Sequence, residues 1–368
     1  MRKLLLSEHS RKISIEERIN FAKLTRDQAC LLPADQKLRY FFSLQVSHLK
    51  LDRVEANINQ HLGPYSDARI LTLIGPPGAG KTSFAENAIA NRMRSSERGQ
   101  QPFLFVAAPA HGSVQIPWSA VYRKILESGQ EPLIDHKRAT VIEGDRVVTR
   151  GPRVSLDSLR SAVESMLRHR GTRLLALDEV LHLLRFNNTE AVMDTLKSLA
   201  DATDSQLLLI GSYELFGLVT TYAQVGRRSE ILYLDRYRRY IRDDEGMQVE
   251  NQADLNEFAS VISRLQKRWP LEWIPDFSEV CADLLDATLG IVGLLKDFLM
   301  QCLVLQIENG GKWKSAFVRK ALKPASVLSG IRREIESGEE ILTKAGYAQF
   351  SFDNEVLERI ESASAHAM

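Results

Sequence analysis

A glycine-rich segment that ends in Lys-Thr is the part of the sequence best suited to chemistry. It has the spacing G-x-x-x-x-G-K-[ST] from Gly75 to Thr82, follows the apolar run 70–74 and precedes a helical-looking segment. Such glycines let successive backbone N–H groups turn toward phosphate oxygens, and the next helix adds its N-terminal positive charge. Lys81 is predicted to reach the β- and γ-phosphates of ATP, and the Thr82 hydroxyl to bind Mg²⁺. The residues assigned to the nucleotide are Gly75, Pro76, Pro77, Gly78, Ala79, Gly80, Lys81, Thr82 and Ser83.

An acidic pair after a second apolar run supplies further candidate catalytic residues. The run 174–177 leads directly into Asp178 and Glu179. Parallel α/β sheets bind ligands at the carboxyl ends of their strands, so Asp178 is predicted to lie beside the phosphate loop and hold Mg²⁺, directly or through water. Glu179 is then placed to orient or deprotonate an attacking water. Apolar runs that end in Asp-Glu are common, but downstream of a complete phosphate loop this one predicts an Mg²⁺-dependent ATPase.

Three more residues each allow two interpretations from the sequence alone. Ser212 follows the apolar run 207–211, where its hydroxyl could position the water next to the γ-phosphate or serve a turn. Arg227 and Arg228 precede the apolar segment 231–234 and could lie on a solvated turn. One of them could instead reach the ATP of a neighbouring subunit, where an arginine contributes about 10³- to 10⁵-fold in rate.

These residues need a framework that brings the ends of several strands together. From Arg69 onward, apolar strand-like segments alternate with helical ones, which is typical of a parallel α/β sheet. The predicted strands are 69–75, 103–108, 174–179, 207–212 and 231–234. Residues 132–153, between the second and third strands, are loop-like, with a short hairpin predicted over 141–148.

Helical segments flank this α/β region on both sides. In the N-terminal segment, Leu32-Pro33 separates a first helix from a second, predicted from about Asp35 to Leu51. The segment either packs on the ATPase core or forms an arm that docks on a partner or on DNA. Beyond residue 240, helices predicted over 255–269, 277–289 and 291–307 would form a lid over the nucleotide. The predicted domains are a helical extension (1–66), an α/β ATPase core (67–240), an α-helical lid (241–310) and a helical tail (311–368).

The composition narrows the class of protein. The chain of 368 residues is 44% hydrophobic and 26% charged, which is ordinary for a soluble globular protein. Its net charge of +1 means that any DNA contact must come from local basic loops. Its 3 cysteines offer neither a disulfide framework nor a metal-ligand spacing. No window approaches the roughly 20 apolar residues of a membrane span, and the apolar start at Leu4 is too short for a signal peptide. We expect a cytoplasmic protein with no membrane partner.

With these segments placed, the sequence resembles the AAA+ ATPases. More narrowly, it is similar to the TnsC/TniB transposition regulators, which are related to the MuB and IstB target-selection ATPases. The resemblance covers about residues 40–305 and is carried by the phosphate loop, by Leu177-Asp178-Glu179, by the segment 210–215 and by Gly226-Arg227-Arg228. It implies an α/β fold, an AAA+ phosphate-loop NTPase with a five-stranded parallel sheet, an all-α lid and helical N- and C-terminal extensions.

The resemblance also implies a function. Members of the family assemble with ATP into helical filaments or rings on double-stranded DNA, mark the insertion target, recruit the transposase and couple disassembly to ATP hydrolysis. Carried over, Lys81 and Thr82 bind ATP and Mg²⁺, Asp178 and Glu179 serve metal and water, Ser212 is a sensor, and Arg227 or Arg228 is the finger that acts across subunits. The implied partners are double-stranded DNA, further copies of the chain, a transposase and a target selector, with or without a CRISPR complex.

DNA contact in this family runs through loops on the inner face of the oligomer, which follow the phosphate backbone without reading sequence. The candidates between the second and third strands are Arg123, Lys124, Lys137, Arg138, Arg146 and Arg150. Each of them is equally consistent with an ordinary surface charge. If several contact phosphates, affinity falls with salt, with a log-log slope of about −0.9 per phosphate neutralised.

One departure from the family lies at the start of the third lid helix, which usually opens with an arginine that touches the γ-phosphate. The sequence has Gly290-Ile291-Val292-Gly293 there. Lys296 lies one turn further on, and the sequence leaves open whether it replaces the arginine, so slow hydrolysis is expected.

Two other functions stay open. A replication-initiator or clamp-loader-like ATPase would carry a sequence-reading C-terminal domain such as a winged helix, for which residues 311–368 are too short and irregular. A signalling NTPase switch would carry attached repeats or effector domains.

Overall fold

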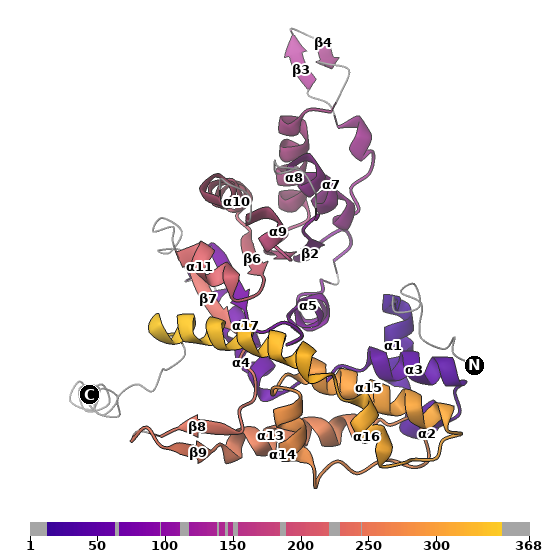
Figure 1. The fold of residues 1–368 in the computed structure, drawn as a ribbon. Coiled ribbons are helices and arrows are strands. Elements are labelled where there is room, and N and C mark those ends of the chain that lie inside the picture. Colours follow the sequence, from indigo (N-terminus) through magenta and orange to yellow (C-terminus); the bar gives the residue numbers. More distant parts are fainter. Residues whose placement is uncertain are drawn as a thin grey trace, which may run out of the picture.

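The computed structural model describes residues 13–62, 66–95, 97–110, 118–137, 140–143, 146–149, 154–184, 189–220, 229–243 and 245–347. Figure 1 shows an α/β part built around one sheet and a helical part that joins N-terminal and later segments of the chain. The long helix α17 (Ala325–Lys344) lies between the two parts.

The sheet has five strands, which lie in the order β2–β5–β6–β1–β7. They are β1 (Ile70–Ile74), β2 (Phe103–Ala107), β5 (Leu174–Asp178), β6 (Gln206–Ile210) and β7 (Ser229–Tyr233). All are parallel, and β1 and β5 are buried at every position, as expected for strands covered on both faces. The predicted five-stranded parallel sheet is therefore confirmed. Because parallel strands start and end together, their carboxyl ends meet at one edge.

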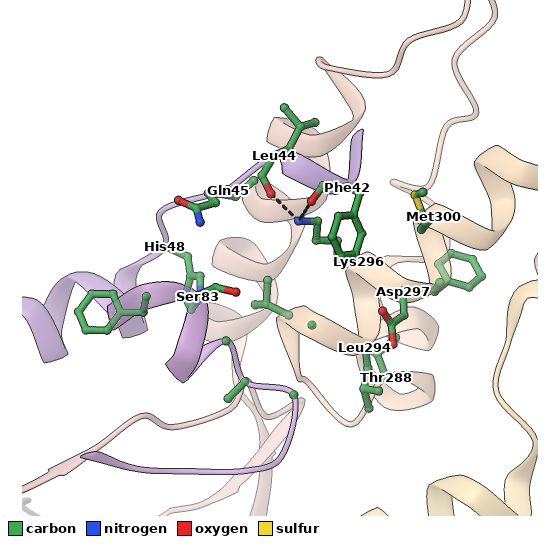
Figure 2. A pocket seen from close by; sticks show the side chains of 18 of the residues that line it. Phe42, Leu44, Gln45, His48, Ser83, Thr288, Leu294, Lys296, Asp297 and Met300 are labelled. Carbon is green, nitrogen blue, oxygen red and sulfur yellow. Dashed lines mark hydrogen bonds between the residues drawn. The ribbon is translucent and has the colours of Figure 1, made fainter. Parts of the chain in front are cut away.

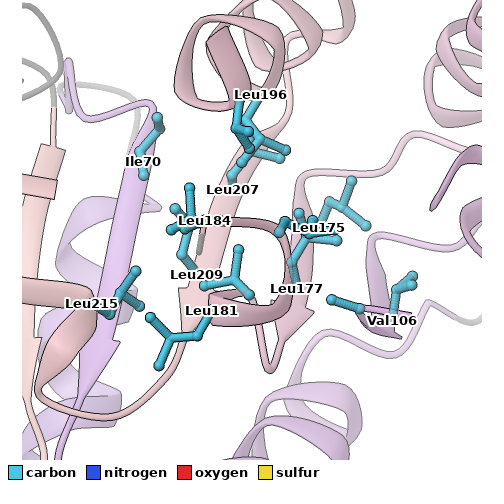
Figure 3. Close-up of a cluster of buried hydrophobic side chains, with 14 of the residues drawn as sticks. Ile70, Val106, Leu175, Leu177, Leu181, Leu184, Leu196, Leu207, Leu209 and Leu215 are labelled. Carbon is cyan, nitrogen blue, oxygen red and sulfur yellow. The ribbon is translucent and has the colours of Figure 1, made fainter. Parts of the chain in front are cut away.

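Helices cover both faces of this sheet, because alternate strand residues point to opposite sides. One face packs on α7 (Trp118–Ser128), α8 (Leu156–His169), α9 (Leu181–Leu184), α10 (Thr189–Thr203) and α11 (Glu214–Thr220). Leu177 and Leu209 belong to that cluster (Figure 3). The other face packs on α4 (Leu49–His61) and on the helix after β1. That helix consists of α5 (Lys81–Ser83), the π-helical η2 (Phe84–Ile89) and α6 (Ala90–Arg92).

The helical part joins segments that are far apart in the sequence. α1 (Ile15–Lys23), α2 (Arg26–Cys30) and α3 (Ala34–Ser43) lie together with α13 (Gln252–Gln266), α14 (Cys281–Ala287), α15 (Val292–Glu308) and α16 (Ala316–Ala321). Their shared core includes Phe41 and Trp269, whose rings meet edge to face at 5.1 Å. The predicted continuous helix from Asp35 to Leu51 is wrong, because the chain leaves the helix at residues 44–48. Consequently α3 packs on the lid helices while α4 packs on the sheet.

Two hairpins and short turns complete the described chain. β3 (Thr140–Glu143) and β4 (Arg146–Thr149) form the predicted antiparallel hairpin, which projects from the α/β part beyond α7 and α8 (Figure 1). A short 3₁₀ turn, η3 (Ile134–His136), precedes it. A second hairpin, β8 (Tyr240–Arg242) and β9 (Gln248–Glu250), was not predicted and extends from the helical part.

The apolar helix α15 owes its composition to burial within the helical part. Leu295, Phe298 and Leu299 are among its residues in the shared core. Within the described ranges no single helix is long and apolar enough to cross a membrane; α14 and α15 meet that test only as a pair, bent by 111°.

Candidate nucleotide-binding site

The glycine-rich segment forms the loop between β1 and α5, at the carboxyl edge of the sheet. Gly78 and Gly80 have φ angles of +77° and +95°, a region that residues with a Cβ rarely adopt. These two glycines turn the chain back so that α5 begins at Lys81, with Gly80 as its N-cap. A strand, a tight loop and a helix N-terminus in this order form an arrangement that binds phosphate groups.

The amine of Lys81 lies against the loop itself. Its Nζ donates hydrogen bonds to the carbonyl oxygens of Gly75 at 2.7 Å and Pro76 at 2.8 Å. Burial lowers the pKa of Lys81 to about 8, although the carboxylates of Asp178 and Glu334 act in the opposite direction. A buried ammonium gains stability when an anion comes close, so the loop holds a cation suited to a phosphate.

Asp178 joins the acidic pair to the phosphate loop. Its Oδ2 accepts a hydrogen bond of 2.6 Å from Thr82 Oγ1, and the residue is only 5% exposed. A carboxylate and a hydroxyl at one place are hard oxygen donors that fit Mg²⁺, which takes its other ligands from water and substrate phosphates. Nowhere among the described residues do three or more His, Cys, Asp or Glu side chains gather in a metal-binding group. A metal at this site would therefore depend on those additional ligands.

Glu179 has a different environment from its neighbour. Its φ of +51° lies in the left-handed region, and its N–H donates to Asp178 Oδ1 at 2.8 Å. The carboxylate lies 3.3 Å from His182 Nε2, and its side chain is 64% exposed. A non-glycine residue in this region is strained, and such strain is concentrated at functional sites. The backbone turn thus directs Asp178 inward and leaves Glu179 open to water.

A cavity of about 970 Å³ opens beside the phosphate loop. Its phosphate side is formed by residues 78–84. Its linker side is formed by the end of α3, by the extended segment 44–48 that joins α3 to α4, which we name the linker segment, and by residues 287–304 of the lid helices (Figure 2). Residues 321–328, at the end of α16 and the start of α17, complete the lining. A volume of this size and a mixed polar and apolar lining are typical of a cavity for a small organic ligand such as a nucleotide.

Lys296 lines the cavity but does not point its charge at the phosphate loop. Its Nζ donates to the carbonyl oxygens of Phe42 at 2.7 Å and Leu44 at 2.5 Å (Figure 2). Burial lowers the pKa of Lys296 to about 8. The amine therefore ties α15 to the linker segment, and in this structure Lys296 does not take the place of the missing lid arginine.

The glycines at the start of α15 have a steric explanation. A Cβ added to Gly293 would lie 1.9 Å from the carbonyl oxygen of Gly78, and one added to Gly290 would lie 1.7 Å from that of Tyr237. Both distances are far inside van der Waals contact, so the lid helix rests directly on the phosphate loop. No side chain fits where the family resemblance leads us to expect an arginine.

The other predicted residues are placed less fully. Ser212 follows β6 at the loop edge of the sheet, where the preceding Gly211 N–H donates to Leu73 O at 3.1 Å. Arg227, Arg228, Arg138 and Arg150 lie outside the described residues. For Arg146 only the backbone position in β4 is described. Arg123 forms an ion pair with Asp135, Lys137 pairs with Glu131 at 2.6 Å, and Lys124 is exposed.

The linker segment is the part of the site that sequence reasoning missed. His48, at its end, is 3% exposed, and its Nδ1 lies 3.0 Å from the Tyr237 hydroxyl. Burial lowers the pKa of His48 to about 4, so the imidazole is neutral near pH 7. Its Nε2 is buried with no hydrogen-bond partner among the described residues. The only local signal was Ser47-His48 before α4, since Ser and similar residues often precede a helix.

Comparisons with known proteins show the fold in which this site is built. Residues 64–219 match the family model of an AAA domain. The Aeropyrum pernix ORC1 protein, solved in complex with DNA, shares 17% identity and a TM-score of 0.51 over 81% of this chain and 68% of that one. The Walker-type ATPase paby2304 of Pyrococcus abyssi shares 14% identity and a TM-score of 0.45 over 86% of this chain and 75% of that one. PCH-2 of C. elegans shares 12% identity and a TM-score of 0.37 over 88% of this chain and 72% of that one. No curated protein matches. The fold is that of an AAA+ phosphate-loop ATPase.

Proposed function

We propose that the chain is an ATP-hydrolysing regulator of DNA transposition, of the TnsC/TniB kind, that assembles on double-stranded DNA. The observation that best supports ATP hydrolysis is the 2.6 Å hydrogen bond between Thr82 Oγ1 and Asp178 Oδ2. It joins the phosphate loop and the acidic pair at one edge of the sheet, where phosphate-loop ATPases hold their metal. The transposition role rests on the sequence resemblance. The AAA domain match supports the nucleotide-binding core, which the regulator shares with the alternative functions.

In this proposal the residues divide into binding and catalytic groups. The loop from Gly75 to Ser83 holds the triphosphate, Lys81 neutralises its charge, and Thr82 and Asp178 hold Mg²⁺. Bound ATP supplies the phosphoanhydride bond that is hydrolysed. The exposed Glu179 orients or deprotonates the attacking water, and Ser212 acts at the neighbouring strand end.

The position of β7 supports a finger that acts between subunits. Arg227 and Arg228 immediately precede Ser229, which pairs with Ile70 at the amino end of β1. The phosphate loop follows the other end of β1, about 16 Å away for a strand of this length. β7 is also an edge strand. Arg227 and Arg228 themselves lie outside the described residues, and we propose that one of them serves a neighbouring copy.

DNA contact in this proposal comes from the region between β2 and β5. The β3–β4 hairpin projects from the α/β part, and Arg146 belongs to its second strand (Figure 1). Two of the six predicted contacts have carboxylate partners, since Arg123 pairs with Asp135 and Lys137 with Glu131. We therefore place most weight on Lys124, whose side chain is exposed, and we keep Arg146 because of its position in the projecting hairpin.

A replication-initiator-like ATPase is the alternative that one observation favours. The same fold occurs in an ORC1 protein whose structure was solved with DNA. Within the described residues 309–347, however, α16 packs on α15, and Ile335 and Leu342 of α17 are buried in the cluster of the α/β part. Within residues 309–347 these helices therefore return to the body of the molecule and form no separate sequence-reading unit.

Electron microscopy of the protein with duplex DNA and a non-hydrolysable ATP analogue tests the proposal. We expect ordered filaments or rings that need the analogue and that form on DNA of any sequence. Monomers under these conditions would contradict assembly, and binding restricted to one DNA sequence would favour the initiator. The transposase and target selector would then be sought as proteins that bind the assembled form.

The finger has its own test. Subunits with Arg227→Ala and Arg228→Ala lack the finger but keep the phosphate loop, whereas Lys81→Ala subunits bind nucleotide weakly but keep the finger. Mixing the two should restore part of the ATPase activity, because each supplies what the other lacks. If the mixture is as inactive as its components, the arginines do not act between subunits.

A further inference from the structure

The C-terminal helix α17 connects the two parts of the molecule. It starts beside the lid helices, where Leu328 lines the nucleotide cavity, and it ends on the α/β part (Figure 1). Ile335 and Leu342 are buried there in the same cluster as Tyr213 and Phe216 of the β6–α11 region. The ring of Tyr347, just beyond the helix, meets that of Phe216 edge to face at 5.4 Å.

Gly338 lets α17 approach Tyr213 very closely. A Cβ at this position would lie 2.1 Å from Cγ of Tyr213, so no residue other than glycine fits without movement of the ring or the helix. Tyr213 directly follows Ser212, the candidate sensor at the end of β6. By contrast, a Cβ added to Gly330 in the same helix would meet nothing within 4 Å. Of these two glycines, only the one at the end of α17 that packs on the turn after β6, where Ser212 lies, is in close contact.

Glu339, the next residue, makes the strongest polar contacts of α17. Its carboxylate accepts two bonds from the Arg236 guanidinium, at 2.7 and 3.0 Å, and lies 3.0 Å from Nη2 of Arg238. The Tyr233 hydroxyl donates to it at 3.4 Å. Its side chain is only 16% exposed, so solvent screens these contacts less than it would at the surface. Bidentate arginine–carboxylate pairs fix direction as well as position.

Arg236 and Arg238 belong to a short stretch, residues 234–238, that bonds both to the strand before the phosphate loop and to the base of the lid. We name it the joint segment. At its start, Leu234 N–H donates to Ile74 O at 2.8 Å, directly before the phosphate loop. At its other end, Tyr237 N–H donates to the carbonyl oxygen of Gly290 at 3.0 Å, at the base of α15. The joint segment thus connects the phosphate loop with the lid, and Glu339 holds its arginines.

We propose that Glu339 and Gly338 are positioning residues of the ATPase site, through which α17 holds the Ser212–Tyr213 turn and the joint segment in the geometry needed for hydrolysis. This inference rests on the proposed ATPase function and adds the C-terminal helix to its machinery. Neither residue touches the phosphate loop, so they act on the alignment of the reacting groups more than on the capture of ATP. Misalignment of a catalytic group by about 1 Å is enough to slow a reaction up to 100-fold.

A matched pair of glutamates tests the polar contact. Glu339→Gln removes the carboxylate that pairs with Arg236 and that shares Arg238 with Asp235. Glu340→Gln changes the neighbouring carboxylate, which pairs only with the exposed Lys344 at 2.6 Å in the contacts described. We expect Glu339→Gln to lower kcat for ATP hydrolysis about tenfold or more with KM within about twofold, and Glu340→Gln to leave both unchanged. Thermal melting identifies a temperature at which every variant is folded, and the rates are compared there.

A matched pair of glycines tests the steric contact. Both Gly338→Ala and Gly330→Ala raise the helix propensity of α17, but only the first adds a methyl group that overlaps Tyr213. Gly338→Ala should lower kcat, and Gly330→Ala should not. In a Tyr213→Gly background the Cβ, Cγ and Cδ2 atoms that the added methyl group would meet are gone, so Gly338→Ala should have little additional effect on kcat.

The outcomes separate this inference from the function on which it rests. A wild-type chain that binds but does not hydrolyse ATP would overturn the proposed ATPase and the positioning role together. An active wild type whose Glu339→Gln variant has the same kcat as Glu340→Gln would overturn the positioning role alone. A rise in KM with unchanged kcat would show that α17 serves nucleotide binding and would equally contradict the proposal.

Discussion

Two lysines line the same cavity in nearly the same physical state, yet they belong to different sides of it. Lys81 Nζ donates to two carbonyl oxygens, those of Gly75 and Pro76, and Lys296 Nζ to two others, those of Phe42 and Leu44. Burial lowers the pKa of each to about 8. They differ in the sequence distance to their partners, which is 6 and 5 residues for Lys81 but 254 and 252 for Lys296.

That difference in distance corresponds to a difference in role. Lys81 bonds its own loop, so exchanging a carbonyl for a phosphate leaves the packing of the molecule intact. Lys296 joins α15 to a segment from the other end of the chain, so losing its partners would separate two walls of the cavity. We infer that the phosphate side carries the chemistry of the site, whereas the linker side determines its shape.

The largest effect expected from this comparison is on the chemical step. Glu179→Gln keeps the size of the side chain but removes the base on the phosphate side, so hydrolysis should slow by about 10²- to 10⁴-fold with ATP still bound. The assembled form on DNA should then persist, because disassembly is proposed to need hydrolysis. A phosphate-release assay gives the rate, with Glu190→Gln, an exposed glutamate at the start of α10, as the control. An unchanged rate would remove Glu179 from the catalytic group.

The next effect separates the two lysines directly. Lys81→Ala removes the cation of the phosphate side and should weaken ATP binding about 100-fold, with nucleotide-dependent DNA binding lost as well. Lys296→Met keeps the length of the side chain and removes only the tie between α15 and the linker, so ATP binding should weaken by less than about tenfold. Titration with a fluorescent ATP analogue measures both. Equal losses would mean that the linker side also binds phosphate.

The same comparison explains what could be predicted from the sequence. The strands and the phosphate side follow from contiguous patterns, in which apolar runs lead into the loop at Gly75 and into Asp178. The linker side depends on contacts between distant residues. Leu44 and Val46 follow Phe41 and Phe42 by three and four residues, so they continue a helical pattern that the structure interrupts. Glycines at the start of α15 were visible, but only the tertiary contact of Gly293 with Gly78 gives their reason. The docking of α17 through Gly338 had no local signal.

A smaller effect tests the contact where the two sides meet. Gly293→Ala would place a methyl group against the carbonyl oxygen of Gly78, which can be relieved only by moving α15 or the phosphate loop. Overpacking of this kind costs about 1–3 kcal/mol of stability, and ATP affinity should fall about tenfold as the loop or the lid shifts. Gly330→Ala, which adds a methyl group in open space, is the control for replacing a helix glycine. Unchanged affinity would mean that the loop binds phosphate independently of the lid.

The smallest effect concerns pH. Burial lowers the pKa of Lys81 to about 8 in the free protein, whereas a bound phosphate would raise it. Between those two pKa values the bound state holds more protons than the free state, so ATP affinity should fall as the pH rises through about 8. The last phosphate proton of ATP is lost near pH 6, so the charge of the nucleotide is nearly constant there.

For a pKa of about 8, the loss of affinity between pH 7 and 8.5 is about fourfold. Calorimetry in buffers of different ionisation enthalpy should show proton uptake on binding over the same range. Lys296 has a similar pKa, so Lys296→Met is the necessary control, and the pH dependence should persist in it. A dependence that disappears in Lys296→Met would assign the titrating amine to the linker side. That result would contradict the inference that the phosphate side carries the chemistry of the site and the linker side only its shape.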